Sequence, residues 1–135
     1  MKYTYADAYN DEVGNRFYEQ IDSIRQRLAD YTPTESWWME SVGMYIAHED
    51  EEVRGFCAFY RADKADGVAV WKLSVMESAE QTAIEKELLK HVISFAKQRG
   101  YPWVDVGAAV SSEEIPQLYA SLGFEIEYVG LAMPI

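Results

Sequence analysis

Three strand-like segments, followed directly by one long helical pattern, fill the middle of this sequence. The segments span residues 42–48, 53–61 and 68–76, and the turns between them are short and rich in Asp, Glu and Gly. Apolar runs joined in this way pair as an antiparallel meander. Residues 79–99 then place apolar side chains three and four positions apart, which is the spacing of an amphipathic helix. The pattern predicts a sheet with a helix packed against one of its faces.

Shorter elements flank this centre. They are a strand at residues 3–5, a helix at 14–30, a short helix or ordered loop at 34–40, a strand at 102–107, a helix at 113–122 and a strand at 124–133. Ser78, with Gln81 three positions later, is the expected N-cap of the long helix, and Gly100 is its expected C-cap. Because that helix separates the strands at 68–76 and 102–107, those two strands are expected to be parallel neighbours.

The expected fold is a single α/β (α+β) domain over residues 1–135, with a mixed, mostly antiparallel sheet and helices on both faces. No repeat, low-complexity tract or Gly/Ser linker supports a division into two domains. No apolar stretch approaches the roughly 20 residues of a membrane helix, and the N-terminal residues lack the apolar core of a signal peptide. We therefore expect a cytoplasmic protein without a membrane partner.

The chain carries 12 basic and 23 acidic side chains, which gives a net charge of −11. Phosphates repel a domain this acidic, so nucleic acid is not an expected partner. An acidic surface could attract a cationic amine or a basic peptide, or it could serve solubility alone. Cys57 has no second cysteine to pair with and only two histidines accompany it, so neither a disulfide nor a metal site is expected.

Two stretches, residues 51–56 (EEVRGF) and 118–124 (LYASLGF), combine with the order of the elements into a family pattern. Leu88 and Leu89 match its paired leucines, and residues 98–100 match the usual end of its long helix. In this joint spacing the chain resembles the GNAT superfamily of N-acetyltransferases. The resemblance implies that acetyl-CoA is the co-substrate, that no metal takes part, and that the two parallel strands splay apart.

The resemblance places the pyrophosphate of acetyl-CoA at the start of the long helix, where backbone N–H groups are unpaired and the helix dipole is positive. The cofactor-binding residues that it implies are Gln81, Thr82, Ala83, Ile84, Glu85 and Lys86, with Ser112 at a position where many members have asparagine. These residues would hold the phosphates mainly through their backbone amides.

The start of this helix departs from the family pattern at three positions. Glu80, Ala83 and Glu85 stand where members have Gln or Arg, then Gly, then Gly or Ala. Two like charges about 4 Å apart repel by roughly 1 to 4 kcal/mol, so a carboxylate beside the pyrophosphate would weaken binding. Alternatively, both glutamates point outward and Lys86 or Lys90 supplies positive charge. The loop is thus a degenerate version of the family's pyrophosphate-binding loop.

The resemblance also implies how acetyl transfer would proceed. Backbone N–H groups of Leu73, Ser74 and Val75 would polarise the thioester carbonyl, and Tyr119 would be the acid that protonates the leaving thiolate. A phenol with an ordinary pKa of about 10 suits a thiolate whose conjugate acid has a pKa of about 8.5. Tyr119 could instead be a tyrosine packed on the sheet. The general base is left open between Asp105, Glu77, His48 and a water relay.

Trp37 and Trp38 lie where the family's variable early helices wall the acceptor cleft. Aromatic walls with nearby carboxylates, here Glu35 and Glu40, would suit an amine substrate. Packing in the core is the alternative for both tryptophans. Cys57, in the middle of a strand, is expected to be a small buried hydrophobic residue.

The expected function is an acetyl-CoA-dependent N-acetyltransferase that modifies an amine of a small molecule, peptide or protein by direct attack. A catalytically degenerate member of the same fold, acting as a binding or regulatory module, is the alternative. A third option is that the acidic surface mimics nucleic acid and occupies a basic protein. The acceptor, the pathway and the oligomeric state stay open, with a homodimer among the options.

Overall fold

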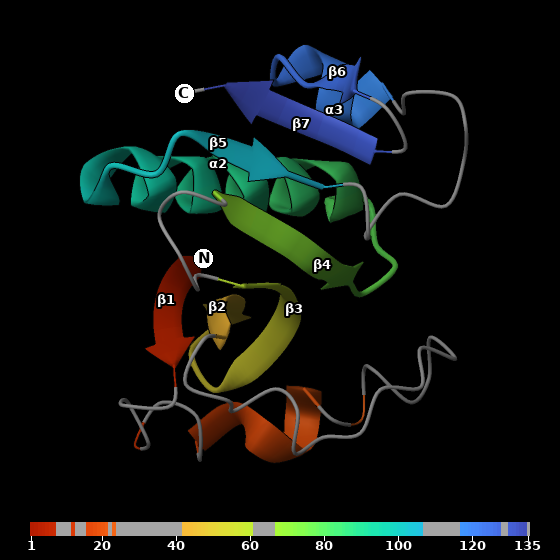
Figure 1. Cartoon of the computed structure of the whole chain (residues 1–135). Coiled ribbons are helices and arrows are strands. Elements are labelled where there is room, and N and C mark those ends of the chain that lie inside the picture. Colours follow the sequence, from red (N-terminus) through yellow and green to blue (C-terminus); the bar gives the residue numbers. More distant parts are fainter. Residues whose placement is uncertain are drawn as a thin grey trace.

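The described strands of the computed structural model form one seven-stranded sheet in the order β1-β2-β3-β4-β5-β7-β6 (Figure 1). The structure describes residues 1–7, 12, 16–21, 23, 42–60, 67–106, 117–127 and 130–134. The strands are β1 (Lys2–Asp7), β2 (Val42–Glu49), β3 (Glu52–Tyr60), β4 (Val68–Val75), β5 (Trp103–Asp105), β6 (Glu125–Glu127) and β7 (Gly130–Pro134). The helices are α2 (Gln81–Arg99) and α3 (Gln117–Ser121), and residues 16–21 are also helical.

The predicted antiparallel meander is confirmed, since β1, β2, β3 and β4 pair in chain order. The turn between β2 and β3 closes on the pair Glu49 and Glu52, and Asp50 within it has a positive φ of 50°. Aspartate tolerates this left-handed conformation better than most residues, which suits it to a tight turn. One irregularity follows the turn, because the register between β2 and β3 shifts between Ala47 and His48.

A second register shift lies between β3 and β4. Ala58 pairs with Lys72, whereas the next residue, Phe59, pairs with Val70, so residue 71 is an extra residue on β4. An extra residue reverses the faces that the following side chains occupy. Leu73 therefore packs toward the same core as Val70.

Helix α2 buries the apolar stripe that its sequence predicts. The buried side chains are Ile84, Leu88, Leu89, Val92, Phe95 and Ala96. Gly100 ends the helix in the left-handed conformation, with φ 76°, and the N–H of Tyr101 donates to the carbonyl of Ala96 at 2.9 Å. Glycine adopts this conformation without the steric cost of a side chain, so the predicted C-cap is confirmed.

The predicted N-cap of α2 is wrong. The helix begins after Glu80, which makes no side-chain capping bond, and Ser78 forms the turn that precedes it. The hydroxyl of Ser78 accepts from the N–H of Glu80 at 3.2 Å, and its carbonyl accepts from the N–H of Gln81 at 3.3 Å. Ser78 therefore lies two residues before the actual N-cap, Glu80, and its side chain stabilises a local turn instead of the helix start. Serine side chains favour turns of this kind.

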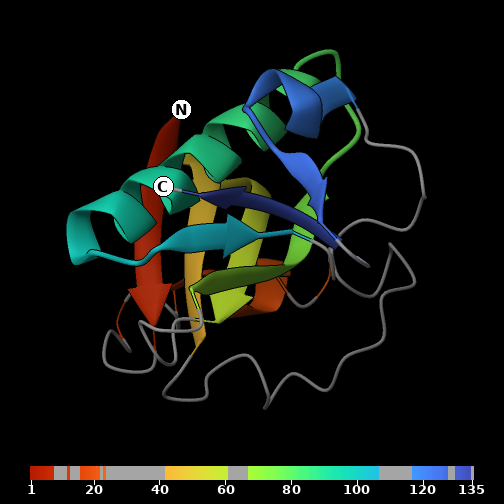
Figure 2. The same ribbon diagram turned by 45° about the horizontal axis from the view of Figure 1, so that its top comes forward.

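Two cores lie on opposite faces of the sheet, which confirms helices on both faces (Figure 2). The α2 core lies between that helix and the sheet and includes Cys57, Tyr119 and Phe124. The first-helix core lies under residues 16–21, where Phe17 and Ile21 pack on the sheet beside Ala58. Each core is made by alternate side chains of the same strands, as the two-residue period of a strand dictates.

The predicted parallel pair is present but short. β4 and β5 are parallel and share only two register positions, Val68 with Val104 and Ala69 with Asp105. In Figure 1 the two strands start side by side and then diverge toward the end of β4. The splay concerns the described residues of β4 and β5, since residues 107–116 lie outside the described part of the chain.

The single strand expected at residues 124–133 is instead two strands. β6 and β7 pair antiparallel, with Ile126 opposite Leu131, and β7 continues the sheet by pairing with β5. Residues 128 and 129 are Tyr and Val, both strand-forming types, so Gly130 is the one turn-favouring residue that the sequence offers at the break.

The remaining helix predictions fall partly on undescribed residues. Of the helix expected at 14–30, residues 16–21 are confirmed, and of the helix expected at 113–122, α3 is confirmed. The segment 34–40 lies outside the described residues. Within the described part of the chain, α2 and its shorter companions all lack the length or the hydropathy to cross a membrane.

Candidate active site

The first turn of α2 leaves backbone amides outside the regular helical hydrogen bonds, although the N–H of Gln81 donates to the carbonyl of Ser78 at 3.3 Å. Glu80 makes no side-chain bond to them, and the first turn contains no acidic residue. Regular helical bonding starts with the N–H of Ile84, which donates to the carbonyl of Glu80 at 3.0 Å. The N–H groups before it have no helical partner and lie at the positive end of the helix dipole. These amides, with the exposed side chains of Thr82 and Ala83 beside them, fit an anion such as a phosphate.

The predicted cofactor residues do not all present their side chains to a ligand. Thr82 and Ala83 are exposed, whereas Gln81, Glu85 and Lys86 are half-buried. The side chain of Ile84 is 4% exposed and belongs to the α2 core, so only its backbone is available. Ser112, Trp37 and Trp38 lie outside the described residues.

The two glutamates that depart from the family pattern have different surroundings. Glu80 is exposed to solvent. Glu85 is half-buried, and this burial raises the pKa of its carboxyl group. A raised pKa means that the neutral form is favoured relative to a carboxyl group in water. A charge on Glu85 is therefore less screened by solvent than one on exposed Glu80.

Tyr119 lies on α3 and is only 6% exposed. Its ring packs edge-to-face on Phe124, with centroids 5.9 Å apart and an interplanar angle of 89°. Burial, and then the charges of Cys57 and Glu85, raise the pKa of Tyr119 to about 12. The phenol thus keeps its proton in the free protein and is a weaker acid than the sequence alone suggests.

The groups that affect the pKa of Tyr119 come from elements that are far apart in the chain. Cys57 is on β3, Glu85 on α2 and Tyr119 on α3. Cys57 is fully buried in the α2 core, and burial raises the pKa of its thiol, so it stays an unreactive hydrophobic residue as predicted. The effect of Glu85 on the pKa of Tyr119 has no signal in the linear sequence, because it depends on how the fold brings Tyr119 into the α2 core.

The three β4 residues expected to supply amides lie beyond the parallel pair. Leu73, Ser74 and Val75 pair with β3 on one side, while the described part of β5 pairs with β4 only as far as Ala69. In a strand, alternate backbone groups point to opposite neighbours. Amides that do not bond to β3 in this stretch therefore open into the splay between β4 and β5.

His48 is removed from the candidate bases by its surroundings. It is 2% exposed, its Nδ1 lies 2.9 Å from the carbonyl of Asp50 and its Nε2 lies 2.7 Å from the hydroxyl of Thr4. Because a carbonyl can only accept, Nδ1–H donates to it. The ring also packs on Phe17, with centroids 4.6 Å apart, so both nitrogens and the ring serve the fold.

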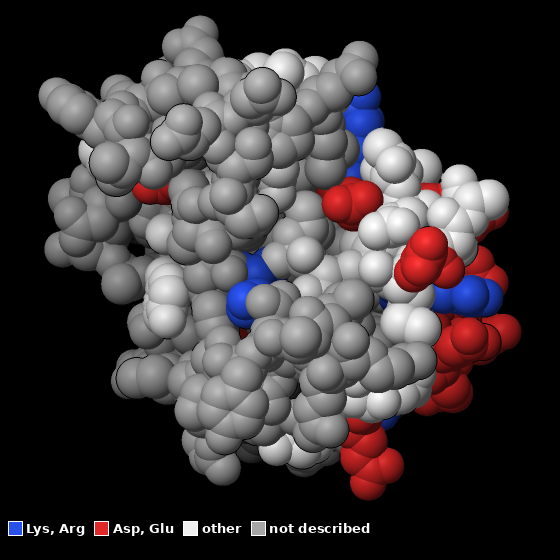
Figure 3. Space-filling view, turned by 90° about the vertical axis from the view of Figure 1, so that its right-hand side faces the viewer, with Lys and Arg blue, Asp and Glu red and all other residues white. Residues whose placement is uncertain are grey.

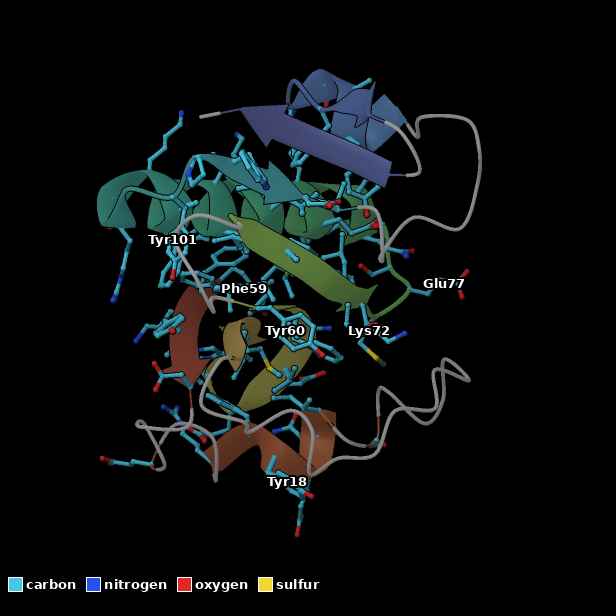
Figure 4. The ribbon with its side chains drawn as sticks, viewed as in Figure 1. Tyr18, Phe59, Tyr60, Lys72, Glu77 and Tyr101 are labelled. Carbon is cyan, nitrogen blue, oxygen red and sulfur yellow. The ribbon has the colours of Figure 1, made fainter. Side chains whose placement is uncertain are left out.

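The other two candidate bases differ in position. Asp105 is half-buried at the end of β5, opposite Ala69, where the parallel pairing stops. Glu77 is exposed in the loop from β4 to α2 and points away from the sheet in Figure 4. Asp105 is thus the candidate at the mouth of the splay. Within the described part of the chain, no group of His, Cys, Asp and Glu could hold a metal ion.

Two exposed glutamates lie where β4 leads into α2. Figure 3 faces this end and shows acidic groups along one side of it, with a few Lys or Arg among them. Glu77 and Glu80 are exposed there. Any anion that binds at the opening of α2 must therefore be held against an unfavourable local field.

The fold is shared with solved acetyltransferase structures. An aminoglycoside 6'-N-acetyltransferase from Enterococcus faecium superposes with a TM-score of 0.73 at 14% identity, over 99% of this chain and 97% of that chain. The ribosomal-protein-S18-alanine N-acetyltransferase from Escherichia coli gives a TM-score of 0.70 at 18% identity, over 99% and 94%. An aminoglycoside N-acetyltransferase in complex with CoA gives 0.66 at 21% identity, over 93% and 92%. At such identities the likeness shows the fold alone.

The family follows from a comparison of sequence. No curated protein matches the chain. The sequence model described as "Acetyltransferase (GNAT) family", however, matches residues 7–124, from the end of β1 to the residue before β6. The match thus covers the meander, α2 with its open amides, and α3 with Tyr119. This chain belongs to the GNAT family of acetyltransferases.

Proposed function

We propose that this chain transfers an acetyl group from acetyl-CoA to an amine of a small molecule, peptide or protein by direct attack. The observation that carries the proposal is the opening of α2, whose N-cap residue Glu80 makes no side-chain capping bond to the amides of the first turn. An uncapped helix start is a ready site for the phosphates of CoA.

The binding residues follow from that opening. The amides of Thr82 and Ala83 would hold the diphosphate, and that of Gln81 would join them by giving up its 3.3 Å bond to the carbonyl of Ser78, with Lys86 half-buried beside them and Ser112 as a further proposed contact. The methyl group of Ala83 is exposed and occupies less space than most side chains, so it leaves a close approach open. When bound, acetyl-CoA supplies an activated thioester.

The transfer would use groups on both sides of the splay. Amides among Leu73, Ser74 and Val75 would donate hydrogen bonds to the carbonyl oxygen as negative charge develops there. Tyr119 would hold its proton on Oη for the departing sulfur. Asp105, or a water molecule that it orients, would take the proton of the acceptor amine. The related structures named for aminoglycoside and protein-alanine acetylation support an amine as the acceptor class.

One observation favours the alternative of a binding module without catalysis. Glu85 places a half-buried carboxyl group where the family has glycine or alanine, within electrostatic reach of Tyr119. If this group stays charged, it opposes the diphosphate by roughly 1 to 4 kcal/mol at about 4 Å, and less where solvent screens it. Loss of the cofactor would leave a fold that binds a partner.

Calorimetry with CoA and with pantetheine separates the two functions. Pantetheine lacks the diphosphate, so we expect CoA to bind at micromolar level and pantetheine far more weakly. Acetyl-CoA at about 100 times its dissociation constant should also stabilise the fold by about 2.7 kcal/mol. Acetyl-CoA that changes neither the melting temperature nor any amine in the mixture would support the binding module instead.

A further inference from the structure

Lys72 lies on the face of β4 that is turned away from α2. It pairs directly with Ala58, which belongs to the first-helix core. Directly paired residues of antiparallel strands place their side chains on the same face. The next residue, Leu73, pairs with Cys57 and packs toward the α2 core, as strand alternation requires. The lysine thus belongs to the face of residues 16–21.

The extra residue on β4 is the reason for this placement. Val68 and Val70 both lie in the α2 core, and simple alternation would put residue 72 on the same side. The register shift at residue 71 moves Lys72 to the opposite face instead. A lysine beneath α2 would be an unfavourable buried charge, whereas on the opposite face it is half-buried.

Lys72 is also next to the proposed point of transfer. It is three residues beyond Ala69, where pairing with β5 stops, and it directly precedes Leu73 of the proposed amide group. Figure 4 shows Lys72 in the second half of β4, on the side nearer the helix of residues 16–21, with Glu77 further out. Tyr119 lies in the α2 core, on the other face. An acceptor that approached Leu73 from the face opposite Tyr119 would therefore come up on the same face of β4 as the lysine.

We propose that Lys72 binds an oxyanion, a carboxylate or a phosphate, that the acceptor carries close to its reactive amine. This inference rests on the proposed acetyl transfer and names its substrate class. Lys72 already has an interaction within the chain, which the acceptor would share or replace. An ammonium group also disfavours a second positive charge beside the amine, so a polycationic acceptor is the wrong class.

The overall charge of the chain does not decide against an anionic acceptor. The net charge of −11 repels anions at long range, but salt at physiological strength screens charges more than about 8 Å apart. A half-buried contact pair is screened much less, so the local lysine governs a bound group. Long-range repulsion lowers the rate of encounter, whereas the contact sets the preference between two acceptors of similar size.

The test compares amines that differ only in the oxyanion. Glycylglycine is paired with glycylglycinamide, and O-phosphoethanolamine with ethanolamine, at saturating acetyl-CoA and with free amine concentrations matched. We expect kcat/KM to be about tenfold higher for at least one anionic member than for its neutral counterpart. The pair that shows the preference identifies the oxyanion. Equal rates within both pairs, or faster neutral amines, would overturn the proposal.

Variants assign the preference to the lysine. Lys72→Met keeps the length of the side chain and removes its charge, so the preference should fall to about twofold or less, while Lys72→Arg should retain it. Lys90→Met is the matched control, because Lys90 is exposed on α2 and pairs with Glu87 at 3.3 Å. A preference that survives in Lys72→Met, or disappears in Lys90→Met, contradicts the assignment.

A binding measurement separates this inference from the proposed function. Calorimetry with N-acetylglycylglycine and N-acetylglycylglycinamide, and with the N-acetyl derivatives of the second pair, needs no turnover. We expect an anionic product to bind the wild type more tightly, and Lys72→Met to lose that difference. Turnover of amines without any charge preference refutes only the lysine. The absence of both CoA binding and turnover refutes the proposed function, whereas a Lys72-dependent anion preference would then remain as a property of the binding module.

Discussion

Two acid-rich regions of this chain hold their carboxylates in opposite ways. In the turn between β2 and β3, Glu51 pairs with Arg16 through two hydrogen bonds, one of them 2.8 Å from Nε to Oε2. This pairing lowers the pKa of Glu51. At the start of α2, burial raises the pKa of Glu85. In the first region an arginine of the same chain balances the charge of Glu51. In the second region burial disfavours the charged form of Glu85, and a bound anion nearby would disfavour it further.

The turn is tied down by more than its ion pair. Gln20 donates from Nε2 to the carbonyl of Glu51 at 2.5 Å and accepts from the N–H of Val53 at 2.8 Å. Arg54 adds contacts to Glu49 at 3.7 Å and to Glu52 at 3.6 Å. Exposed ion pairs of this kind contribute little each, so the glutamine bonds to backbone groups are the stronger link. Acids in this turn therefore serve the structure.

The largest expected effect comes from the ligand-facing region. Tyr119→Phe should lower kcat about a hundredfold, since a positioned proton donor contributes at least that much. The dissociation constant of CoA and the melting temperature should change little, because the ring still packs on Phe124. Stopped-flow assays and calorimetry measure these quantities. Tyr101→Phe, at another buried tyrosine of the α2 core, is the control and should retain its rate. A joint loss of rate and stability in Tyr119→Phe would make Tyr119 a packing residue.

The second effect tests the structural region. Gln20→Ala removes both bonds to the turn and should lower the free energy of unfolding by about 1 to 3 kcal/mol, because two backbone groups lose their partner. Urea denaturation measures the loss, with Glu19→Ala on the exposed side of the same helix as control. CoA binding to the folded variant should be unchanged. An unchanged free energy of unfolding would mean that the two bonds of Gln20 do not stabilise this turn.

The third effect is a gain in affinity for CoA, whereas most mutations at a binding site weaken binding. Glu85→Gln removes a charge beside the proposed phosphate site at nearly constant volume, so CoA should bind about tenfold more tightly. Isothermal calorimetry gives the affinity. Glu87→Gln is the matched control, since Glu87 is also of intermediate burial on α2 but pairs with Lys90. Weaker binding in a folded Glu85→Gln protein would mean that the carboxyl group assists the ligand, and would remove the contrast between the two regions.

The smallest effect is a difference in pH dependence. Because the pKa of Glu51 is lowered, its contribution to stability is present above the ordinary carboxyl pKa and is lost as pH falls through its folded-state value. Because the pKa of Glu85 is raised, its contribution is present at low pH and is lost as pH rises through its folded-state value. Unfolding free energies of Glu51→Gln and Glu85→Gln, measured between about pH 3 and pH 7, should deviate from wild type with opposite slopes. Slopes of the same sign would contradict the assignment.

Much of the fold is predictable because it depends on local periodicity. The spacing of Ile84, Leu88 and Val92 predicts α2, and Gly100 predicts where it ends. The parallel placement of β4 and β5 follows from the helix that connects them. The break between β6 and β7 is not predictable in this way, since strand-forming residues occupy it.

The candidate site is less predictable than the fold. Family spacing locates the start of α2 and Tyr119, but not the effect of Glu85 on the pKa of Tyr119, which depends on how Tyr119 packs into the α2 core. The face that Lys72 occupies depends on one extra residue in β4. Residue 71 is a tryptophan, which is common in regular strands, so its sequence gives no warning of a bulge.

The short pairing between β4 and β5 affects the local opening of the sheet. Two register positions join its halves, and α2 braces them by contacting β2, β3, β4 and β5. Amide hydrogen exchange in β5 should therefore be faster than in the centre of β3, whose pairing with β2 and β4 is much longer than that of β5 with β4 and β7. A ligand that binds between the diverging parts of β4 and β5 breaks no backbone hydrogen bonds between these strands, because the two strands are not paired beyond Ala69 and Asp105.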